Sequence, residues 1–234
     1  MRIALMVLRL FYAVPYYIFR ISWMGKHSTK ESTFEFIKKC AKTSNKKGRI
    51  NVKATGIENL PKEDGYVLFP NHQGLYDVLI FLDTCPRPFS FVVKKEVKNV
   101  ILLKQVIESL HSLAIDRQDV RQSMRVIQEM ADRVKNGENF LIFAEGTRSR
   151  MGNRMREMKG GSFKSAVKAK APIVPCALID CFKPFDENSV REITVQVHYL
   201  KPLYYEEYKD MTTLEIAAEV KRRIEEVLFT VEAY

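Results

Sequence analysis

A histidine and an aspartate five positions apart, His72 and Asp77, follow the apolar run at residues 66–70. Imidazole changes charge near neutral pH, so a histidine can take a proton from a hydroxyl and return it within one turnover. A carboxylate behind the ring fixes its tautomer and stabilises the imidazolium. The pair predicts general-base chemistry, with His72 as the base and Asp77 as its orienting partner. A helix cap or a surface ion pair is the alternative interpretation.

The spacing of this pair constrains the backbone around it. On one continuous helix, residues three or four apart face each other, whereas residues five apart diverge. Gly74 lies between the two side chains and is free to adopt a dihedral that other residues resist. We therefore expect a loop that starts at His72 and a helix that starts near Tyr76, which together fold Asp77 back toward the imidazole.

A second set of polar residues follows the apolar run at residues 140–144. Glu145, Gly146, Thr147 and Arg148 come first, and Arg150, Arg154, Arg156, Lys159, Gly160 and Gly161 follow before a helix expected from Ser162. Glycines let backbone approach a ligand, hydroxyls donate hydrogen bonds, and guanidinium groups grip oxygens in pairs. The segment predicts a phosphate site with Arg148 as its main cation. Its spacing matches neither a Walker loop nor a Gly-x-Gly-x-x-Gly turn, and a solvated basic loop is the alternative.

The elements that position these residues alternate between strand and helix. Short apolar or alternating runs predict strands at 50–54, 67–69, 89–93, 112–115, 140–143, 173–178 and 193–198. Helical spacing predicts helices at 78–82, 97–110, 120–134 and 213–228. The pattern indicates a single α/β domain with a central, largely parallel sheet flanked by helices. Ligands of such folds bind beyond the carboxyl ends of the strands, where His72, Asp116 with Arg117, and Glu145 are expected.

Composition limits the partners of the chain. Its 234 residues suffice for one sizeable domain, and 38 Lys and Arg against 28 Asp and Glu give a net charge of +10. We expect an anionic partner, which could be a membrane surface, an acidic carrier protein, a phosphorylated small molecule or a nucleic acid. The four cysteines form no CxxC pair and the four histidines are scattered, so we expect free thiols and predict no metal.

The N-terminal residues suggest a membrane-binding segment. The apolar run within residues 3–24 is bracketed by Arg9 and Arg20, which makes it shorter than the ~20 residues of a spanning helix. No small-residue cleavage site follows it, and Tyr12, Tyr16, Tyr17 and Trp23 suit a helix lying at the lipid headgroups. A second amphipathic, lysine-rich segment covers residues 29–47. We predict interfacial helices at 1–47 and a catalytic domain at 48–234; helices packed on the domain itself are the alternative.

Four blocks of the sequence resemble those of the glycerolipid acyltransferases. They are Asn71-His72 with Asp77, Ile115-Asp116-Arg117, residues 143–150, and Ile173-Val174-Pro175, in the family's order and approximate separations. Within the family, the chain is similar to the 1-acylglycerol-3-phosphate acyltransferases, and the likeness covers about residues 50–200. Three positions depart from the common pattern: Gly74 replaces a frequent serine, Ala144 replaces a frequent proline, and Pro-x-x-Gly is absent before the second block.

The resemblance implies acyl transfer from an acyl thioester to the free sn-2 hydroxyl of lysophosphatidic acid, which yields phosphatidic acid without an acyl-enzyme. It assigns His72 as general base, Asp77 behind it, and Glu145, Gly146, Thr147 and Arg148 as acceptor-binding residues. Asp116 and Arg117 would line the acceptor side, and Lys94 would be a second phosphate contact; a helix N-cap role for Asp116 and a solvated role for Lys94 are the alternatives.

The implied partners are an anionic membrane surface and acyl carrier protein or coenzyme A as thioester carrier. No further cofactor is expected, and the implied location is the cytoplasmic face of the cell membrane, bound peripherally or monotopically. A glycerol-3-phosphate or lysophospholipid acyltransferase is the alternative within the family. A non-catalytic lipid-binding protein is the alternative of another class. Nucleic-acid binding is disfavoured, because the basic residues do not interleave with aromatic ones along one groove.

Overall fold

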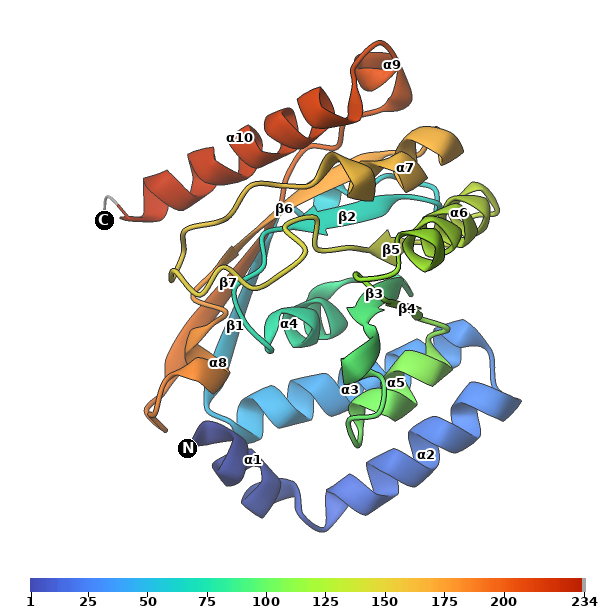
Figure 1. Ribbon diagram of the computed structural model, residues 1–234. Coiled ribbons are helices and arrows are strands. Elements are labelled where there is room, and N and C mark those ends of the chain that lie inside the picture. Colours follow the sequence, from blue (N-terminus) through green and yellow to red (C-terminus); the bar gives the residue numbers. More distant parts are fainter. Residues whose placement is uncertain (233–234) are drawn as a thin grey trace.

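The computed structural model describes residues 1–232, and its centre is a seven-stranded sheet with helices on both faces (Figure 1). The strand order is β1-β7-β6-β2-β5-β3-β4. Every neighbouring pair is parallel except β6 and β7, which confirms the expected largely parallel sheet. The strands are β1 (Ile50–Thr55), β2 (Val67–Pro70), β3 (Ser90–Lys94), β4 (Leu113–Ile115), β5 (Phe140–Leu141), β6 (Ile173–Ile179) and β7 (Ile193–Tyr199).

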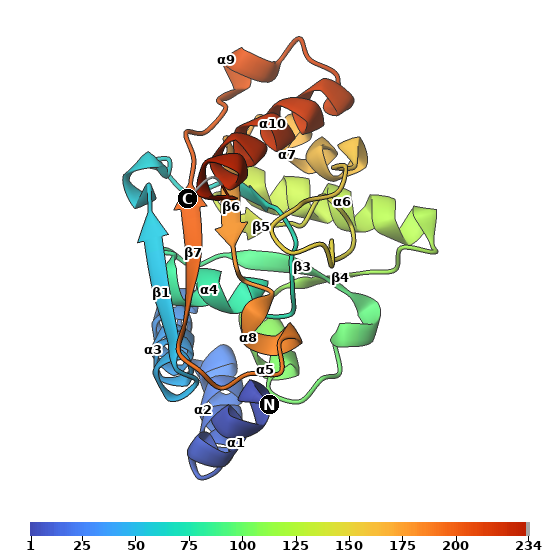
Figure 2. The ribbon, with the colours of Figure 1, turned by 90° about the vertical axis from the view of Figure 1, so that its left-hand side faces the viewer.

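The helices form two layers, one on each face of the sheet (Figures 1 and 2). They are α1 (Arg2–Leu10), α2 (Ala13–His27), α3 (Lys30–Lys47), α4 (Asp77–Thr84), α5 (Leu103–Ser109), α6 (Val120–Lys135), α7 (Lys164–Ala169), α8 (Lys183–Asp186), α9 (Tyr205–Tyr208) and α10 (Thr213–Glu232). One core contains side chains of α3, α4 and α5, and the other contains side chains of α6, α7 and α10. The central strand β2 contributes side chains to both cores: Leu68 lies in the first, and Val67 and Phe69 lie in the second. Burial on both faces explains its unbroken apolar sequence.

The expected helix at residues 97–110 is only partly correct. A 3₁₀ turn covers Lys95–Val97, and the α-helix begins at Leu103, after Leu102 has taken a positive φ of 68°. Val100 and Ile101 fit the helical spacing, yet they are 52% and 76% exposed. These two apolar residues do not contact the described core, so the periodicity overestimates the length of the helix.

The N-terminal segment forms three helices rather than two. The first expected helix is broken into α1 and α2, which are bent by 81°. No single described helix has the length and hydropathy to cross a bilayer, whereas α1 and α2 taken together meet both criteria. The second expected helix is confirmed as α3.

The N-terminal helices also pack on the rest of the chain through their inner faces. Phe34, Ile37 and Ala41 of α3 are buried in the same core as α4. On α2, the Ile21 carbonyl accepts a hydrogen bond of 3.0 Å from the Ser109 hydroxyl of α5. The division into a segment at 1–47 and a domain at 48–234 stays a prediction. In the structure, α3 before that boundary and α4 after it contribute to the same core.

Candidate active site

His72 and Asp77 lie in contact at the carboxyl end of β2. The distance between His72 Nδ1 and Asp77 Oδ2 is 2.8 Å. Residues 71–76 form a loop, and α4 begins at Asp77, as the spacing of the two residues predicts. The His72 side chain is 18% exposed and the Asp77 side chain 1%. With the Nδ1 proton directed at the carboxylate, Nε2 is the ring nitrogen with a lone pair for a ligand proton.

The Asp77 carboxylate also organises the loop before it. Its Oδ2 accepts the Gln73 N–H at 2.6 Å, and its Oδ1 accepts the Gly74 N–H at 3.0 Å. Burial raises the pKa of Asp77, and hydrogen bonds from His72, Gly74 and Gln73 oppose that shift. A carboxylate held this way stabilises a positive charge on the adjacent imidazole.

The backbone around Gly74 leaves little room for a side chain. A Cβ atom there would lie 3.1 Å from the Phe182 Cα and 3.2 Å from the Cys181 carbonyl oxygen. Both atoms belong to the backbone that follows β6, so they cannot yield as a flexible side chain would. This close approach favours glycine at position 74 over a residue with a Cβ atom.

Glu145 is buried, with 2% of its surface exposed, and both of its carboxylate oxygens accept backbone hydrogen bonds. Oε1 accepts the His72 N–H at 2.6 Å, and Oε2 accepts the Arg156 N–H at 2.8 Å. The Ser149 N–H in turn donates to the His72 carbonyl at 2.7 Å. Burial raises the pKa of Glu145, and the two backbone donors oppose the shift. The segment from Glu145 to Arg156 is thus fastened to the residue that carries the base.

Several residues of the site were missed by the sequence analysis. The Phe143 ring stacks on the His72 imidazole with a centroid distance of 4.0 Å and an interplanar angle of 23°. The Gln73 amide donates to Asn153 Oδ1 and to the Leu178 carbonyl, both at 2.9 Å. Phe143 lies inside a recognised block, but the contacts of Gln73 with Asn153 and Leu178 span 80 and 105 positions of the sequence and leave no local signal.

The remaining residues of the predicted phosphate site lie on the loop after Glu145. Gly146 has a φ of +75°, which glycine adopts without strain, and Thr147 is exposed. The Arg148 guanidinium is partly exposed and lies 3.6 Å from the carboxylate of Asp186 on α8. Ser149, the next residue along the chain, donates its N–H to the His72 carbonyl. Arg148 is therefore one residue away from a direct contact with the residue that carries the imidazole. The structure brings this loop and the dyad together.

Lys94, Asp116 and Arg117 lie at the ends of β3 and β4, further along the sheet. Lys94 Nζ pairs with Glu96 at 3.1 Å, and the Asp116 carboxylate pairs with Lys95. Asp119, not Asp116, caps α6 by accepting the Gln122 N–H at 2.9 Å, so the N-cap alternative for Asp116 is wrong. Within residues 1–232, the hydrogen bonds and ion pairs of these three side chains do not include His72 or Asp77.

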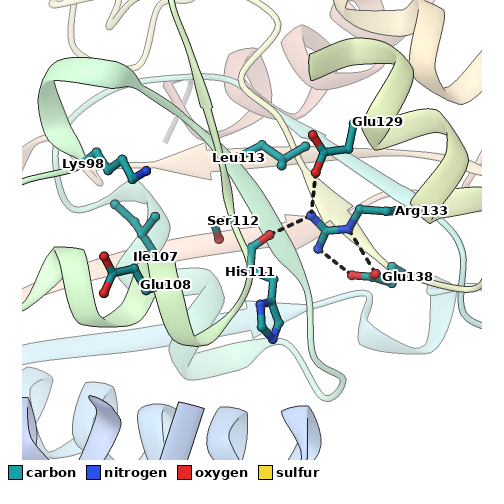
Figure 3. A pocket seen from close by; sticks show the side chains of 9 residues that line it. All are labelled: Lys98, Ile107, Glu108, His111, Ser112, Leu113, Glu129, Arg133 and Glu138. Atoms are coloured by element: carbon teal, nitrogen blue, oxygen red, sulfur yellow. Dashed lines mark hydrogen bonds and ion pairs between the residues drawn. The ribbon is translucent and has the colours of Figure 1, made fainter. Parts of the chain in front are cut away.

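A cavity of about 510 Å³ lies apart from the dyad, between α5 and α6 (Figure 3). Its guanidinium group, from Arg133, donates to Glu138 at 2.7 Å, to the His111 carbonyl at 2.8 Å and to the Ser90 hydroxyl at 3.0 Å. The Arg133 guanidinium is thus already engaged by protein groups, and the described residues that line the cavity contain no counterpart of the His72–Asp77 pair, so we place the candidate site at His72 instead. Among the described residues, no group of three or more His, Cys, Asp or Glu side chains is arranged to hold a metal ion.

Comparison with known proteins gives consistent matches. The family model described as Acyltransferase matches residues 51–179. A 1-acyl-sn-glycerol-3-phosphate acyltransferase of Borreliella burgdorferi is 28% identical over 168 residues, which are 71% of this chain and 67% of that protein. One of Pseudomonas aeruginosa is 32% identical over 129 residues, 55% of this chain and 49% of that protein. The chain thus spans between about half and two thirds of the length of these relatives.

A solved structure shares the fold. The crystal structure of the 1-acyl-sn-glycerophosphate (LPA) acyltransferase PlsC from Thermotoga maritima superposes with a TM-score of 0.77 at 22% identity. The match covers 97% of this chain and 98% of that one, so it includes the N-terminal helices as well as the sheet.

Proposed function

The chain belongs to the acyltransferase family, and on that premise we propose that it transfers an acyl group from a thioester to the free sn-2 hydroxyl of 1-acylglycerol-3-phosphate. The product would be phosphatidic acid, a precursor in phospholipid synthesis. The names of the relatives support this acceptor. The observation that carries the proposal is the His72–Asp77 contact of 2.8 Å, with the His72 side chain 18% exposed.

The proposed mechanism is direct transfer with His72 as general base. Nε2 takes the proton of the acceptor hydroxyl while the hydroxyl oxygen attacks the thioester carbonyl. Asp77 stabilises the imidazolium, which then gives its proton to the departing thiolate. Positioned base catalysis of this kind typically contributes ~10²- to 10⁴-fold. The chain's own contribution to orientation is the ring stack on Phe143 and the backbone hydrogen bonds around His72.

Arg148 is the proposed phosphate ligand of the acceptor. Its guanidinium is partly exposed, and a phosphate would offer it a bidentate, doubly charged partner in place of Asp186. Glu145, Gly146 and Thr147 form the loop around it. Lys94, Asp116 and Arg117 are proposed to line the acceptor side from the neighbouring strand ends, where Lys94 would be a second phosphate contact.

We propose that α1 and α2 hold the enzyme on the cytoplasmic face of an anionic membrane. Their inner faces pack on the domain, but their outer faces carry a row of exposed apolar side chains: Ile3, Val7, Leu8, Phe11, Tyr12, Tyr16, Phe19 and Trp23. Leu8 is 74% exposed, and Phe11 and Phe19 are each 68% exposed. Exposed apolar side chains flanked by Arg9 and Arg20 suit insertion among lipid headgroups.

An acceptor comparison tests this function. Purified protein is offered an acyl thioester with lysophosphatidic acid, glycerol-3-phosphate or lysophosphatidylcholine in mixed micelles, and products are identified by mass. We expect phosphatidic acid from the first acceptor and little product from the others. Turnover confined to glycerol-3-phosphate or to lysophosphatidylcholine would reassign the acceptor. No turnover with any of them, together with retained lipid binding, would support a non-catalytic lipid-binding protein.

A further inference from the structure

The outer face of α6 carries two parallel rows of exposed side chains. Val120 and Met124 form an apolar row and are 70% and 61% exposed. Arg121 and Arg125 form a second row, are exposed as well and stand at the same spacing of four residues. Because residues four apart lie on the same side of a helix, the two rows run side by side. We call these four residues the α6 surface.

The charges of the α6 surface oppose the local helix electrostatics. The N-terminal end of a helix is its positive end, and acidic residues are favoured there. Asp119 meets this preference at the N-cap, but the first turn of α6 contains no acidic residue, and both arginines lie in its first two turns. Within residues 1–232, neither Arg121 nor Arg125 takes part in an ion pair, whereas Lys221, Arg222 and Arg223 of α10 all do. The surface therefore presents two arginines that take part in no ion pair among the described residues, beside exposed apolar side chains.

The α6 surface lies away from the helices that we propose for membrane binding. The buried side of α6 joins the core shared with α7 and α10, and α1 to α3 pack on the opposite core. Figure 2 shows α6 and α10 on one side of the sheet and α1 and α2 on the other. At the same time α6 follows the carboxyl end of β4, and Asp116 just before it pairs with Lys95 at the end of β3. A partner on this surface would face the aqueous side and still border the edge of the sheet that carries His72.

We propose that the α6 surface docks an acidic carrier protein that presents the acyl thioester. This inference rests on the proposed function and extends it to the donor. Exposed apolar side chains beside a row of arginines match a protein partner that buries the apolar row and pairs acidic side chains with the guanidinium groups. A membrane partner is disfavoured by the position of α6 on the face opposite α1 and α2.

The test compares two donors on one charge-reversal variant. Arg121→Glu/Arg125→Glu is assayed with a long-chain acyl group on an acidic acyl carrier protein and, separately, on coenzyme A. At low salt we expect KM for the carrier-protein thioester to rise by about tenfold or more, because reversed charges repel the partner. For the coenzyme A thioester, kcat/KM should stay within about twofold, since a helix face is not needed to bind it. Val120→Ser/Met124→Ser should reproduce the selective effect without changing charge.

A matched control reverses the same amount of charge elsewhere. Lys53 is exposed on the edge strand β1, at the end of the strand order opposite to β4, and Lys62 is exposed in the connection between β1 and β2. Lys53→Glu/Lys62→Glu should leave both donors unaffected. If it weakens the carrier-protein thioester as strongly as the α6 variant does, net charge alone is responsible and the docking surface is refuted.

Other outcomes also decide the proposal. An equal loss with both donors, unchanged turnover with the carrier protein, or loss of sedimentation with anionic vesicles in the α6 variant would each overturn it. If the wild-type protein turns over neither donor, the proposed function fails. Binding of the fluorescently labelled carrier protein, followed by anisotropy in wild type and variant, then still tests the α6 surface.

Discussion

The Glu145 carboxylate accepts the backbone N–H of His72 at 2.6 Å, and its other oxygen accepts the N–H of Arg156 at 2.8 Å. This contact fixes the main chain of the residue that carries the base, and it joins the dyad to the loop that carries Arg148. The family resemblance assigns Glu145 to the acceptor. The geometry adds a positioning role, and the two roles predict different kinetics.

Glu145→Gln should lower kcat more than it changes KM for lysophosphatidic acid. The amide can accept one of the two backbone hydrogen bonds, but its NH₂ group would meet the other N–H, which displaces either His72 or Arg156. A shift of about 1 Å in a reacting group can cost roughly 100-fold in rate. Steady-state rates over a range of acceptor concentrations measure the two constants. A raised KM with normal kcat would restrict Glu145 to acceptor binding.

The ion pair between Arg148 and Asp186 predicts competition with the acceptor phosphate. Asp186→Asn should lower KM for lysophosphatidic acid by about two- to fivefold, the size expected for releasing a partly exposed ion pair. Arg148→Ala should raise the same KM by about tenfold or more, because hydrogen bonds between charged groups are strong. In the Arg148→Ala background, the Asp186→Asn change should have no effect on KM. A persistent effect there would mean that Asp186 acts on the acceptor independently.

The sequence predicted the order of strands and helices and the local geometry of the dyad, because these depend on patterns within a few residues. Buried runs such as Ile173–Ile179 have one dominant signal, and the loop around Gly74 follows from the spacing of His72 and Asp77. The sequence did not predict which apolar residues are exposed and therefore do not mark a helix that packs on the core. Val100 and Ile101 fit the helical spacing, so the helix that contains α5 was expected to begin too early. The periodicity also gave no sign of the break between α1 and α2.

Contacts across the fold were beyond local reasoning altogether. Asp186 reaches Arg148 only because α8 follows β6, which pairs directly with β2. The backbone near Cys181 that requires glycine at position 74 is brought close by the same pairing. Nothing near Arg148 or Gly74 in the sequence indicates either neighbour. Such relationships emerge from sheet topology, which the strand pattern leaves open.

The exposed apolar row of α1 and α2 predicts the determinants of membrane binding. Leu8→Glu/Phe11→Glu/Phe19→Glu should abolish sedimentation with vesicles of phosphatidylglycerol and phosphatidylcholine, since all three side chains are at least 68% exposed and support no core. Thermal unfolding should change little. The control is Leu214→Glu/Phe229→Glu on α10, where the side chains are 71% and 65% exposed on the opposite layer. Equal loss of sedimentation in the control would argue against a specific membrane face.

The ion pairs of Glu138 predict a dependence of stability on pH. Burial disfavours its charge, but hydrogen bonds from Arg133 and Lys30 outweigh burial and lower the pKa of Glu138 to about 2, from an ordinary value of 4.5. A depressed pKa stabilises the fold above the unfolded value, and this stability is lost as the pH falls from 4.5 toward about 2.

Glu138→Gln should therefore lower the free energy of unfolding by about 1 kcal/mol at pH 7, a modest figure because the side chain is partly exposed. The difference from wild type should be constant between neutral pH and the ordinary carboxyl range and should shrink below it. Denaturant unfolding at several pH values measures this. Glu206→Gln, in a surface pair with Lys209, is the control and should change stability by less than about 0.5 kcal/mol. A Glu138→Gln difference that grows in acid would contradict the linkage.

The central claim is that His72 removes the proton of the acceptor hydroxyl, and the rate of the transfer step in His72→Ala tests it most directly. The rate is measured in a single turnover with saturating thioester and lysophosphatidic acid in mixed micelles. We predict a fall of about 10²- to 10⁴-fold, with unchanged thermal unfolding and unchanged binding to vesicles. A transfer rate within a fewfold of wild type would show that another group takes the proton, and the account of this site would then be wrong.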